Sequence, residues 1–329
     1  MKKYIVAGIL FAATMLVSCG GLQSFTFDQL YPAEVTFPEQ VRTVAVVNHT
    51  PTIPFPKKDL LTLGRLEGDG KVLSESLAGG LADRRYFHQV IISDSVITQE
   101  LTGGEILPQS VVDSLTRVLG VDMILSVDRI QLLTGKKEVY YPGLMAPFAA
   151  FDLKMRPVLR AYIPSRVMPV VTISKVDSLL WDLNPTLSDH DVMNEASQHT
   201  GFTLVNQLVP HWKSVERIYF DGGNPDMRDA AGSLREGDWQ EAGRLWKNLY
   251  DSLKKGKLKS RAAFNMALAC EVQGMMSEAV DWIEKAKSCA TKGSEEDRAA
   301  AFYATILQER AKDFQLLNLQ MARFGNKFN

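Results

Sequence analysis

The sequence predicts an α/β amino-terminal domain followed by an all-α helical domain. Strand-like apolar runs alternate with helical patterns between residues 41 and 127, whereas helical periodicity is continuous after residue 221. A turn-forming segment at residues 221–225 separates the two patterns. The predicted domain bounds are therefore 41–220 and 221–329.

The composition is that of a globular protein, with 46% hydrophobic and 23% charged residues in a chain of 329. These values exclude a disordered chain and a polytopic membrane protein. The 37 basic and 38 acidic side chains give a net charge of -1, which argues against a nucleic-acid partner, because displacing counterions needs a basic footprint. Three cysteines cannot form a disulfide framework.

Residues 1–18 have the pattern of a signal peptide. Lys2 and Lys3 precede an uncharged apolar run over residues 4–17, which is followed by small residues. A helix needs about 20 apolar residues to cross a bilayer, so this run is too short for a transmembrane span.

The end of this segment, Leu16-Val17-Ser18-Cys19, resembles the lipobox of bacterial lipoproteins. The resemblance implies lipidation of Cys19, which makes residues 19–40 a lipidated tether and the membrane a partner through the lipid. The alternative is an ordinary secretory signal in which Cys19 is incidental. Gly20 and the absence of an acidic cluster after Cys19 favour, within this resemblance, the periplasmic face of the outer membrane, with the cell surface as the alternative.

The elements of the α/β domain follow in a regular order. We expect a strand over 41–47, a helix over 70–84, a strand over 89–92, a helix over 111–119 that ends at Gly120, and a strand over 121–127. Two further strand-like runs, 151–163 and 170–180, predict an antiparallel extension of the sheet. A helix over 195–209 is predicted to end at Pro210.

The stretch from Leu119 through Gly120, Val121 and Asp122 to Ser126 resembles an α/β element of the TolB amino-terminal domain and of curli-secretion (CsgG-like) lipoproteins. This resemblance implies the α/β fold and a role in the cell envelope. It implies no catalytic residue.

Thirteen consecutive residues without a charge, 139–151, follow the third strand. One interpretation is an exposed apolar loop that contacts a partner or a membrane surface. The other is a hairpin folded back over the sheet. The candidate contact residues are Tyr140, Tyr141, Leu144, Met145 and Phe148.

The helical domain contains an internal repeat with an offset of 37 residues, in which 237–242 aligns with 274–279. It resembles a tetratricopeptide repeat. Core packing is expected for Trp239, Trp246 and Trp282, and residues 295–320 are expected to add a helical pair or a cap. The residues that define the repeat are Gly237, Trp239, Ala242, Trp246, Gly274 and Ala279.

The two remaining cysteines are predicted to be unpaired thiols. Cys270 precedes the turn at Gly274 and Cys289 lies far beyond it, so they are about 15 Å apart along paired helices. A disulfide requires Cα atoms within about 7 Å.

The chemical motifs are incomplete. A P-loop interpretation of residues 64–72 fails at Arg65 and Val72, and the densest histidine cluster, 189–191, is interpreted as a surface turn. No Gly-x-Ser-x-Gly elbow occurs in the sequence. We therefore expect no catalytic residues, no metal and no cofactor.

Taken as a whole, the chain resembles a family of uncharacterised Bacteroides-type lipoproteins of unknown function, a likeness first seen at residues 209–220. The first hypothesis is a non-catalytic, membrane-anchored binding or scaffold protein that docks a protein or peptide through its helical domain. The alternatives are an envelope hydrolase or glycan-processing enzyme without a recognisable motif, and a subunit of an oligomeric secretion assembly.

Overall fold

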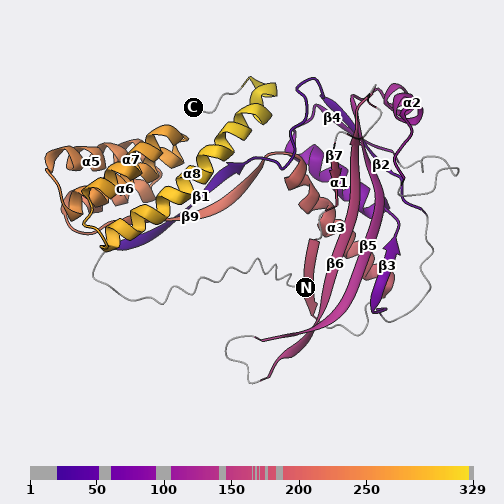
Figure 1. Cartoon of the computed structure of the whole chain (residues 1–329), viewed down its shortest axis with the longest axis horizontal. Coiled ribbons are helices and arrows are strands. Elements are labelled where there is room, and N and C mark those ends of the chain that lie inside the picture. Colours follow the sequence, from indigo (N-terminus) through magenta and orange to yellow (C-terminus); the bar gives the residue numbers. More distant parts are fainter. Residues whose placement is uncertain are drawn as a thin grey trace. The chain divides into compact units, whose positions relative to one another are not determined.

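The computed structural model describes residues 21–51, 61–93, 105–140, 146–164, 166, 169, 171–174, 177–182 and 188–325. The chain divides into two compact units (Figure 1). The helical unit comprises Ser214–Lys312 with the chain up to Gln29, and the sheet unit comprises Leu30–Lys213 with Asp313–Phe328. The predicted fold class is confirmed, since an α/β region precedes a run of helices. In the described ranges, no helix is both long enough and apolar enough to cross a membrane.

The sheet unit contains a seven-stranded sheet in the order β4-β2-β5-β6-β7, with β3 paired to β5 and β8 paired to β6. Its parallel part consists of β2 (Thr43–Asn48), β4 (Gln89–Ser93) and β5 (Met123–Val139). Helices α1 (Lys71–Arg84) and α2 (Gln109–Leu119) connect these strands. The predicted strand and helix order is confirmed, and Gly120 ends α2 in the left-handed conformation, at φ +65°.

The antiparallel part is larger than predicted. The predicted strand at 151–163 is confirmed as β6, while the run at 170–180 divides into β7 and β8, both paired to β6. Strand β3 was not predicted, because its two glycines and two charges do not resemble a strand. These strands are β3 (Gly64–Gly68), β6 (Phe148–Tyr162), β7 (Val171–Ile173) and β8 (Asp177–Asp182).

Helices cover both faces of this sheet. Helix α1 and helix α3 (Asp189–Leu208) pack on one face, where Leu73, Leu77 and Leu81 are fully buried, and α2 packs on the other. Two glycines let α1 and α3 approach closely. A Cβ on Gly80 would lie 2.7 Å from Val205, and one on Gly201 would lie 2.7 Å from Ser76.

The surface turn predicted at residues 189–191 is wrong, because these residues form the first turn of α3. The Ser188 side chain caps the helix by accepting a hydrogen bond from the Asp191 amide. Asp189 is buried and accepts hydrogen bonds from the amide and the hydroxyl of Thr62, at 2.6 and 2.7 Å. Acidic residues are favoured in a first helical turn because the helix dipole is positive there.

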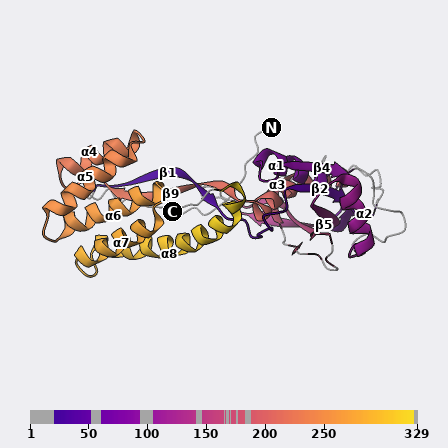
Figure 2. The ribbon, with the colours of Figure 1, turned by 90° about the horizontal axis from the view of Figure 1, so that it is seen from above.

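The helical unit contains a run of helices and a two-stranded β1-β9 sheet, although β1, β9 and α8 also contribute residues to the sheet unit. Figure 2 shows α4 to α8 side by side. Strand β1 lies within the predicted tether, and neither it nor β9 was predicted. The elements are β1 (Leu22–Tyr31), β9 (His211–Phe220), α4 (Pro225–Arg235), α5 (Trp239–Ser252), α6 (Lys257–Val272), α7 (Met276–Cys289), α8 (Glu295–Met321) and a short 3₁₀ helix, Ala322–Phe324.

The residues of the internal repeat occupy matching places. Gly237 and Gly274 have φ values of +83° and +78° in the turns before α5 and α7. Ala242 and Ala279 are fully buried one turn into these helices, as are Trp246 and Ile283 one turn further on. Trp239 and Trp282 are half-buried, in contact with the rings of Phe25 and Tyr250. Residues 295–320 form one continuous helix and no pair, because this stretch contains no glycine or proline to break it.

A buried ion pair connects four elements of the helical unit. Arg217 of β9 donates two hydrogen bonds to Glu271 of α6, at 2.9 and 2.8 Å. Gln29 of β1 and the Tyr303 hydroxyl of α8 also donate to Glu271, at 2.7 and 2.6 Å. Burial, followed by the Glu271 charge, raises the pKa of Tyr303 well above its usual value. Both carboxylate oxygens of Glu271 are therefore hydrogen-bonded.

We predict that Arg217→Met destabilises the helical unit by about 3–5 kcal/mol, because it leaves the Glu271 carboxylate buried without its cation. Urea unfolding followed by circular dichroism measures the change. Arg244→Met is the matched control, since Arg244 pairs with Glu241 on the exposed surface of α5, where solvent screens the pair and its loss should hardly change stability. Equal effects of the two substitutions would contradict the buried network.

The prediction of two unpaired thiols is confirmed, with Cys270 buried and Cys289 half-buried. Burial, and next the Glu278 charge, raises the pKa of Cys270 to about 11. At pH 8 only roughly one Cys270 thiol in a thousand is ionised, and the thiolate is the reactive form.

We therefore expect a thiol reagent to label Cys289 in the folded protein and Cys270 only after unfolding. Mass spectrometry of the labelled peptides measures this, with Cys289→Ser as the control that should leave the folded protein unlabelled at both helical positions. Rapid labelling of Cys270 at pH 8 would show that α6 is not packed as described.

Candidate functional site

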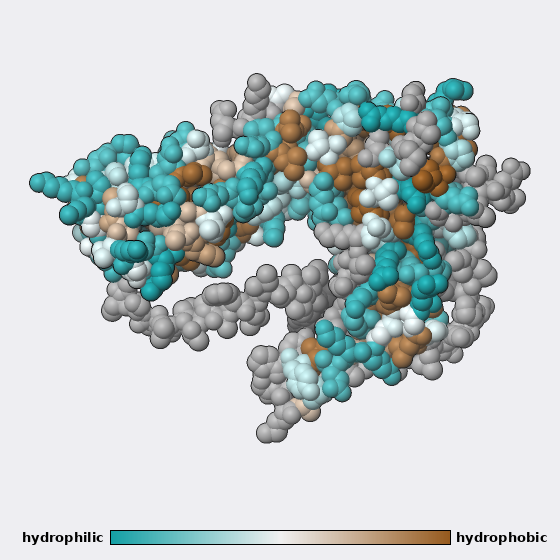
Figure 3. Space-filling model, viewed as in Figure 1, coloured by the Kyte–Doolittle hydropathy of each residue, from teal (hydrophilic) through white to brown (hydrophobic). Residues whose placement is uncertain are grey.

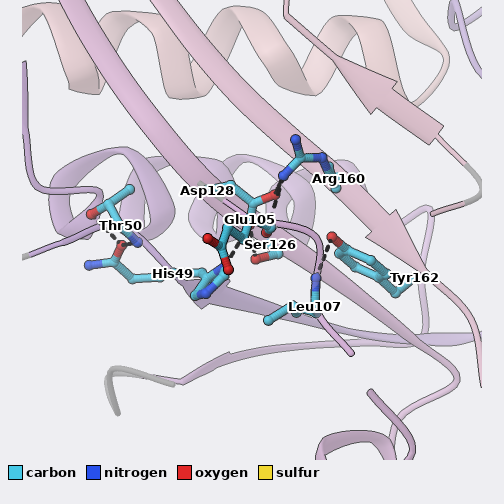
Figure 4. A network of polar contacts seen from close by, with 9 residues as sticks. His49, Thr50, Glu105, Leu107, Ser126, Asp128, Arg160 and Tyr162 are labelled. Carbon is cyan, nitrogen blue, oxygen red and sulfur yellow. Dashed lines mark hydrogen bonds and ion pairs between the residues drawn. The ribbon is translucent and has the colours of Figure 1, made fainter. Parts of the chain in front are cut away.

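Polar residues cluster where β2 ends and β5 is irregular, next to apolar residues of both strands (Figure 4). His49 directly follows β2, while Ser126 and Asp128 belong to β5. The pairing of β5 with β6 shifts register between Val127 and Arg129. This β-bulge is at Asp128, and bulges of this kind redirect a side chain out of its regular alternation.

Asp128 is the centre of the cluster. One of its oxygens contacts the Ser126 hydroxyl and, at 3.1 Å, Nδ1 of His49. The other accepts a hydrogen bond from Nη1 of Arg160, on β6, at 2.6 Å. Asp128 is fully buried and His49 almost so, whereas the Arg160 side chain is 17% exposed. The Arg160 guanidinium thus balances a carboxylate that has no contact with solvent.

Neighbouring contacts extend the cluster to two other parts of the sheet unit. The Thr50 hydroxyl donates to the Asn48 side chain at 2.9 Å and accepts from the Gly70 amide at 2.6 Å. Gly70 is required at the start of α1, because an added Cβ would lie 2.5 Å from the Asn48 oxygen. The Tyr162 hydroxyl accepts a hydrogen bond from the Leu107 amide at 3.2 Å, and burial raises the pKa of Tyr162.

The arrangement is better suited to bracing the fold than to catalysis. If His49 is neutral and donates from Nδ1 to Asp128, Nε2 carries a lone pair that could accept a proton. That nitrogen is buried and has no hydrogen-bond partner among the described residues. A substrate cannot reach it in this conformation, and Asp128 already has three side-chain partners. Among the residues that the structure describes, no three His, Cys, Asp or Glu side chains are placed to hold a metal ion together.

An open groove beside β7 is a second candidate in the sheet unit. Among the described residues that line it, Glu34 has the sole ionisable side chain. A pair of acid and base groups is needed for general acid-base hydrolysis, so the described lining does not supply that chemistry. The groove is lined by Glu34, Val35, Val171, Thr172, Ile173, Ser174 and Gln207.

The predicted contact stretch lies at the end of the β5-β6 hairpin. Tyr140 directly follows β5 and its side chain is 72% exposed. Phe148 begins β6 and pairs with Val139. Tyr141, Leu144 and Met145 lie outside the described residues, as does Cys19. Strands β5 and β6 thus form a hairpin with Tyr140 exposed at its end, and both interpretations of residues 139–151 stay predictions because 141–145 lie outside the described residues.

Sequence reasoning did not find the Asp128 cluster. His49 is one of five histidines that are scattered along the sequence, and none of them has the spacing of metal ligands. A usable signal was the polar triplet Asn48-His49-Thr50 at the end of a buried strand, together with Ser126 and Asp128 in another. The partner Arg160 could not be inferred, because the register of β5 on β6 depends on the bulge.

Comparison with known proteins identifies the family. Residues 41–220, more than half of the chain, match the family model described as Domain of unknown function (DUF8603). The chain belongs to this family. The DUF8603 range contains the whole Asp128 cluster and the β5-β6 hairpin. Residues 228–309 match a second model, Domain of unknown function (DUF6340).

Two further comparisons add little to the DUF8603 match. No curated protein matches the chain. Among solved structures, the chain is similar to a dodecamer of a PelC point variant from Paraburkholderia phytofirmans, at 12% identity over 56% of this chain and 99% of that one. The TM-score is 0.27, which is too low to bear on fold or function.

We predict that Asp128→Asn destabilises the sheet unit by up to about 3–5 kcal/mol, because the Arg160 guanidinium, which is only 17% exposed, loses its counter-ion. Chemical denaturation measures the change. The control is Asp152→Asn on the neighbouring strand β6, where a half-exposed carboxylate lies 3.4 Å from Lys154 and is expected to contribute less than about 1 kcal/mol. A neutral effect of Asp128→Asn would show that the cluster does not brace the fold.

Proposed function

We propose that this protein is a non-catalytic binding or scaffold protein of the cell envelope, anchored to a membrane by a lipid on Cys19. The observation that carries the proposal is the exposed end of the β5-β6 hairpin. It joins an exposed aromatic residue, Tyr140, to a stretch of sequence that contains no charge.

The hairpin extends beyond β3 on one side, while β8 still pairs with β6 as far as Ala150 on the other. Strands β5 and β6 have 17 and 15 residues, and their pairing continues to Val139 and Phe148. The pairing of β3 with β5 stops at Thr134, so residues 135–139 extend beyond it. Lys136, Lys137 and Glu138 are exposed. Figure 3 shows mainly hydrophilic side chains with small hydrophobic areas along this part of the sheet unit. An arm with these properties can reach a partner without disturbing the core.

A second contact surface is proposed on the helical unit, whose repeat resembles a tetratricopeptide array. Strands β1 and β9 already occupy part of its surface, since Phe25 contacts Trp239 of α5 and Phe220 hydrogen-bonds to Asn265 of α6. We expect a protein or peptide partner to use the faces of α5 and α7 that these strands leave exposed.

The location follows from the sequence pattern around Cys19. A lipobox-like segment ending at Cys19, followed by Gly20 and no acidic cluster, supports an outer-membrane lipoprotein on the periplasmic face. The hydrolase alternative gains no specific support from the described residues, because the Asp128 carboxylate is hydrogen-bonded through both oxygens and the described lining of the groove beside β7 has a single ionisable side chain. The secretion-assembly alternative likewise gains no specific support from them.

Exchange of Tyr140 tests this proposal. We expect Tyr140→Ser to lower the affinity for a specific envelope partner by about thirtyfold, since an aromatic residue at an interface centre contributes about 2 kcal/mol to binding. Recovery is measured by affinity capture from solubilised envelopes, with a photoreactive aromatic residue at position 140 to prove direct contact.

Phe302→Ser on α8 is the matched control. Phe302 is 66% exposed, close to the 72% of Tyr140, and it lies in the helical unit. Partner recovery that falls equally with both substitutions, or cross-links at position 302 and none at 140, would show that the hairpin is not the contact element.

A further inference from the structure

Gly21 fixes the start of the described chain at one end of the helical unit. The Asp221 amide donates a 2.7 Å hydrogen bond to the Gly21 carbonyl. A Cβ on Gly21 would lie 2.5 Å from the Gly222 nitrogen, so the two backbones are in direct contact. Cys19 precedes Gly21 by two residues, and two residues span at most about 7 Å. The described chain therefore starts at this end of the unit, two residues after Cys19 in the sequence.

A lysine-rich segment lies at the same end. Residues 254–259, here called the lysine loop, contain Lys254, Lys255, Lys257 and Lys259 between α5 and the first turn of α6. Its Leu258 packs against the turn after β9, since a Cβ on Gly223 would lie 3.2 Å from Leu258 Cδ1. Gly223 is two residues from Asp221, which binds Gly21. The lysine loop and Gly21, which follows the predicted lipidation site by two residues in the sequence, thus lie at the same end of the helical unit.

The four lysine side chains of the loop differ in their exposure to solvent. Lys254 and Lys255 are exposed. Lys257 is 61% exposed and lies 3.3 Å from the Glu296 carboxylate. Lys259 turns inward, where its ammonium donates to the Leu253 carbonyl at 2.7 Å and lies over the Tyr250 ring. Lys254 and Lys255 therefore provide most of the external positive charge.

Acidic residues at this end are mostly engaged with other groups. Asp251 pairs with Lys247 at 2.7 Å, and Glu295 and Glu296 both contact Arg261. Asp297 accepts a hydrogen bond from the Gly293 amide. The carboxylates thus have internal partners, whereas the two exposed lysines face solvent.

We propose that the lysine loop binds anionic phospholipid headgroups of the bilayer that holds the lipid on Cys19. The proposal rests on the lipid anchor of the proposed function. Basic residues at a membrane surface contribute about 1 kcal/mol each, and a basic patch beside an acyl chain supplies a second membrane signal. The loop would also determine which end of the helical unit faces the bilayer, a property that the anchor alone does not fix.

The test uses the whole mature chain from Cys19 onward, produced without its lipid so that acylation does not contribute. Binding is measured by flotation with phosphatidylcholine vesicles, with and without phosphatidylglycerol, at low ionic strength. We expect binding only with phosphatidylglycerol, and Lys254→Gln with Lys255→Gln should lower the partition coefficient by about thirtyfold.

The double substitution Lys136→Gln with Lys137→Gln is the charge-matched control, on the exposed end of the hairpin in the sheet unit. It should leave the partition coefficient unchanged, and circular dichroism checks that both variants are folded. Equal losses for the two variants, or binding that does not depend on phosphatidylglycerol, would overturn the proposal. The anchor is tested separately by uptake of a labelled fatty acid at Cys19 in cells, so the two failures are distinguishable.

Discussion

The helical unit depends on one buried carboxylate, that of Glu271. Its oxygens accept hydrogen bonds from β1, β9 and α8, while the carboxylate itself belongs to α6. Desolvating an ion pair is costly, and an apolar replacement of the whole network could be equally stable. What the charges provide is selectivity, because a shifted strand would leave a charged group buried and unpaired. We infer that Glu271 determines how the two strands are placed on the helices.

The sheet unit uses the same device at a different point. Asp128 is buried at a β-bulge and draws hydrogen bonds from residues of β5 and β6 and from the exit of β2. The bulge shifts the register of β5 on β6 by one residue, and the Arg160 ion pair stabilises the register that the two strands adopt. The cluster has the composition of a catalytic site, with a histidine, an aspartate and a serine. The arrangement differs from a Ser-His-Asp triad, in which the histidine lies between the other two residues. Here Asp128 lies between His49 and Ser126, and Nε2 of His49 is buried.

The sequence was sufficient for those elements whose signal is local. The parallel strands, α1, α2 and the helices of the repeat were predicted because their apolar spacing and their terminal glycines, such as Gly120 and Gly237, are visible along the chain. Strands β1 and β9 were missed because they form only by pairing with each other and packing on the helices. Their contact on α6, Glu271, lies about 50 residues after β9 in the sequence. The Asp128 cluster was missed for the same reason, since its members come from segments about 80 and 32 residues apart. Long-range polar pairing has no periodicity that could be recognised.

Strand β1 changes what a lipid at Cys19 would do mechanically. A tether over residues 19–40 would let the protein rotate freely, because a flexible linker of that length reaches tens of ångströms. Since β1 begins at Leu22 and Gln29 hydrogen-bonds to Glu271, only two residues separate Cys19 from chain that is packed on the helical unit. The strand that follows Cys19 is therefore held by the same carboxylate that organises the helices. If Cys19 carries a lipid, as proposed, a force on that lipid would act on the Glu271 network, and the anchor and the core of the helical unit would not be independent parts.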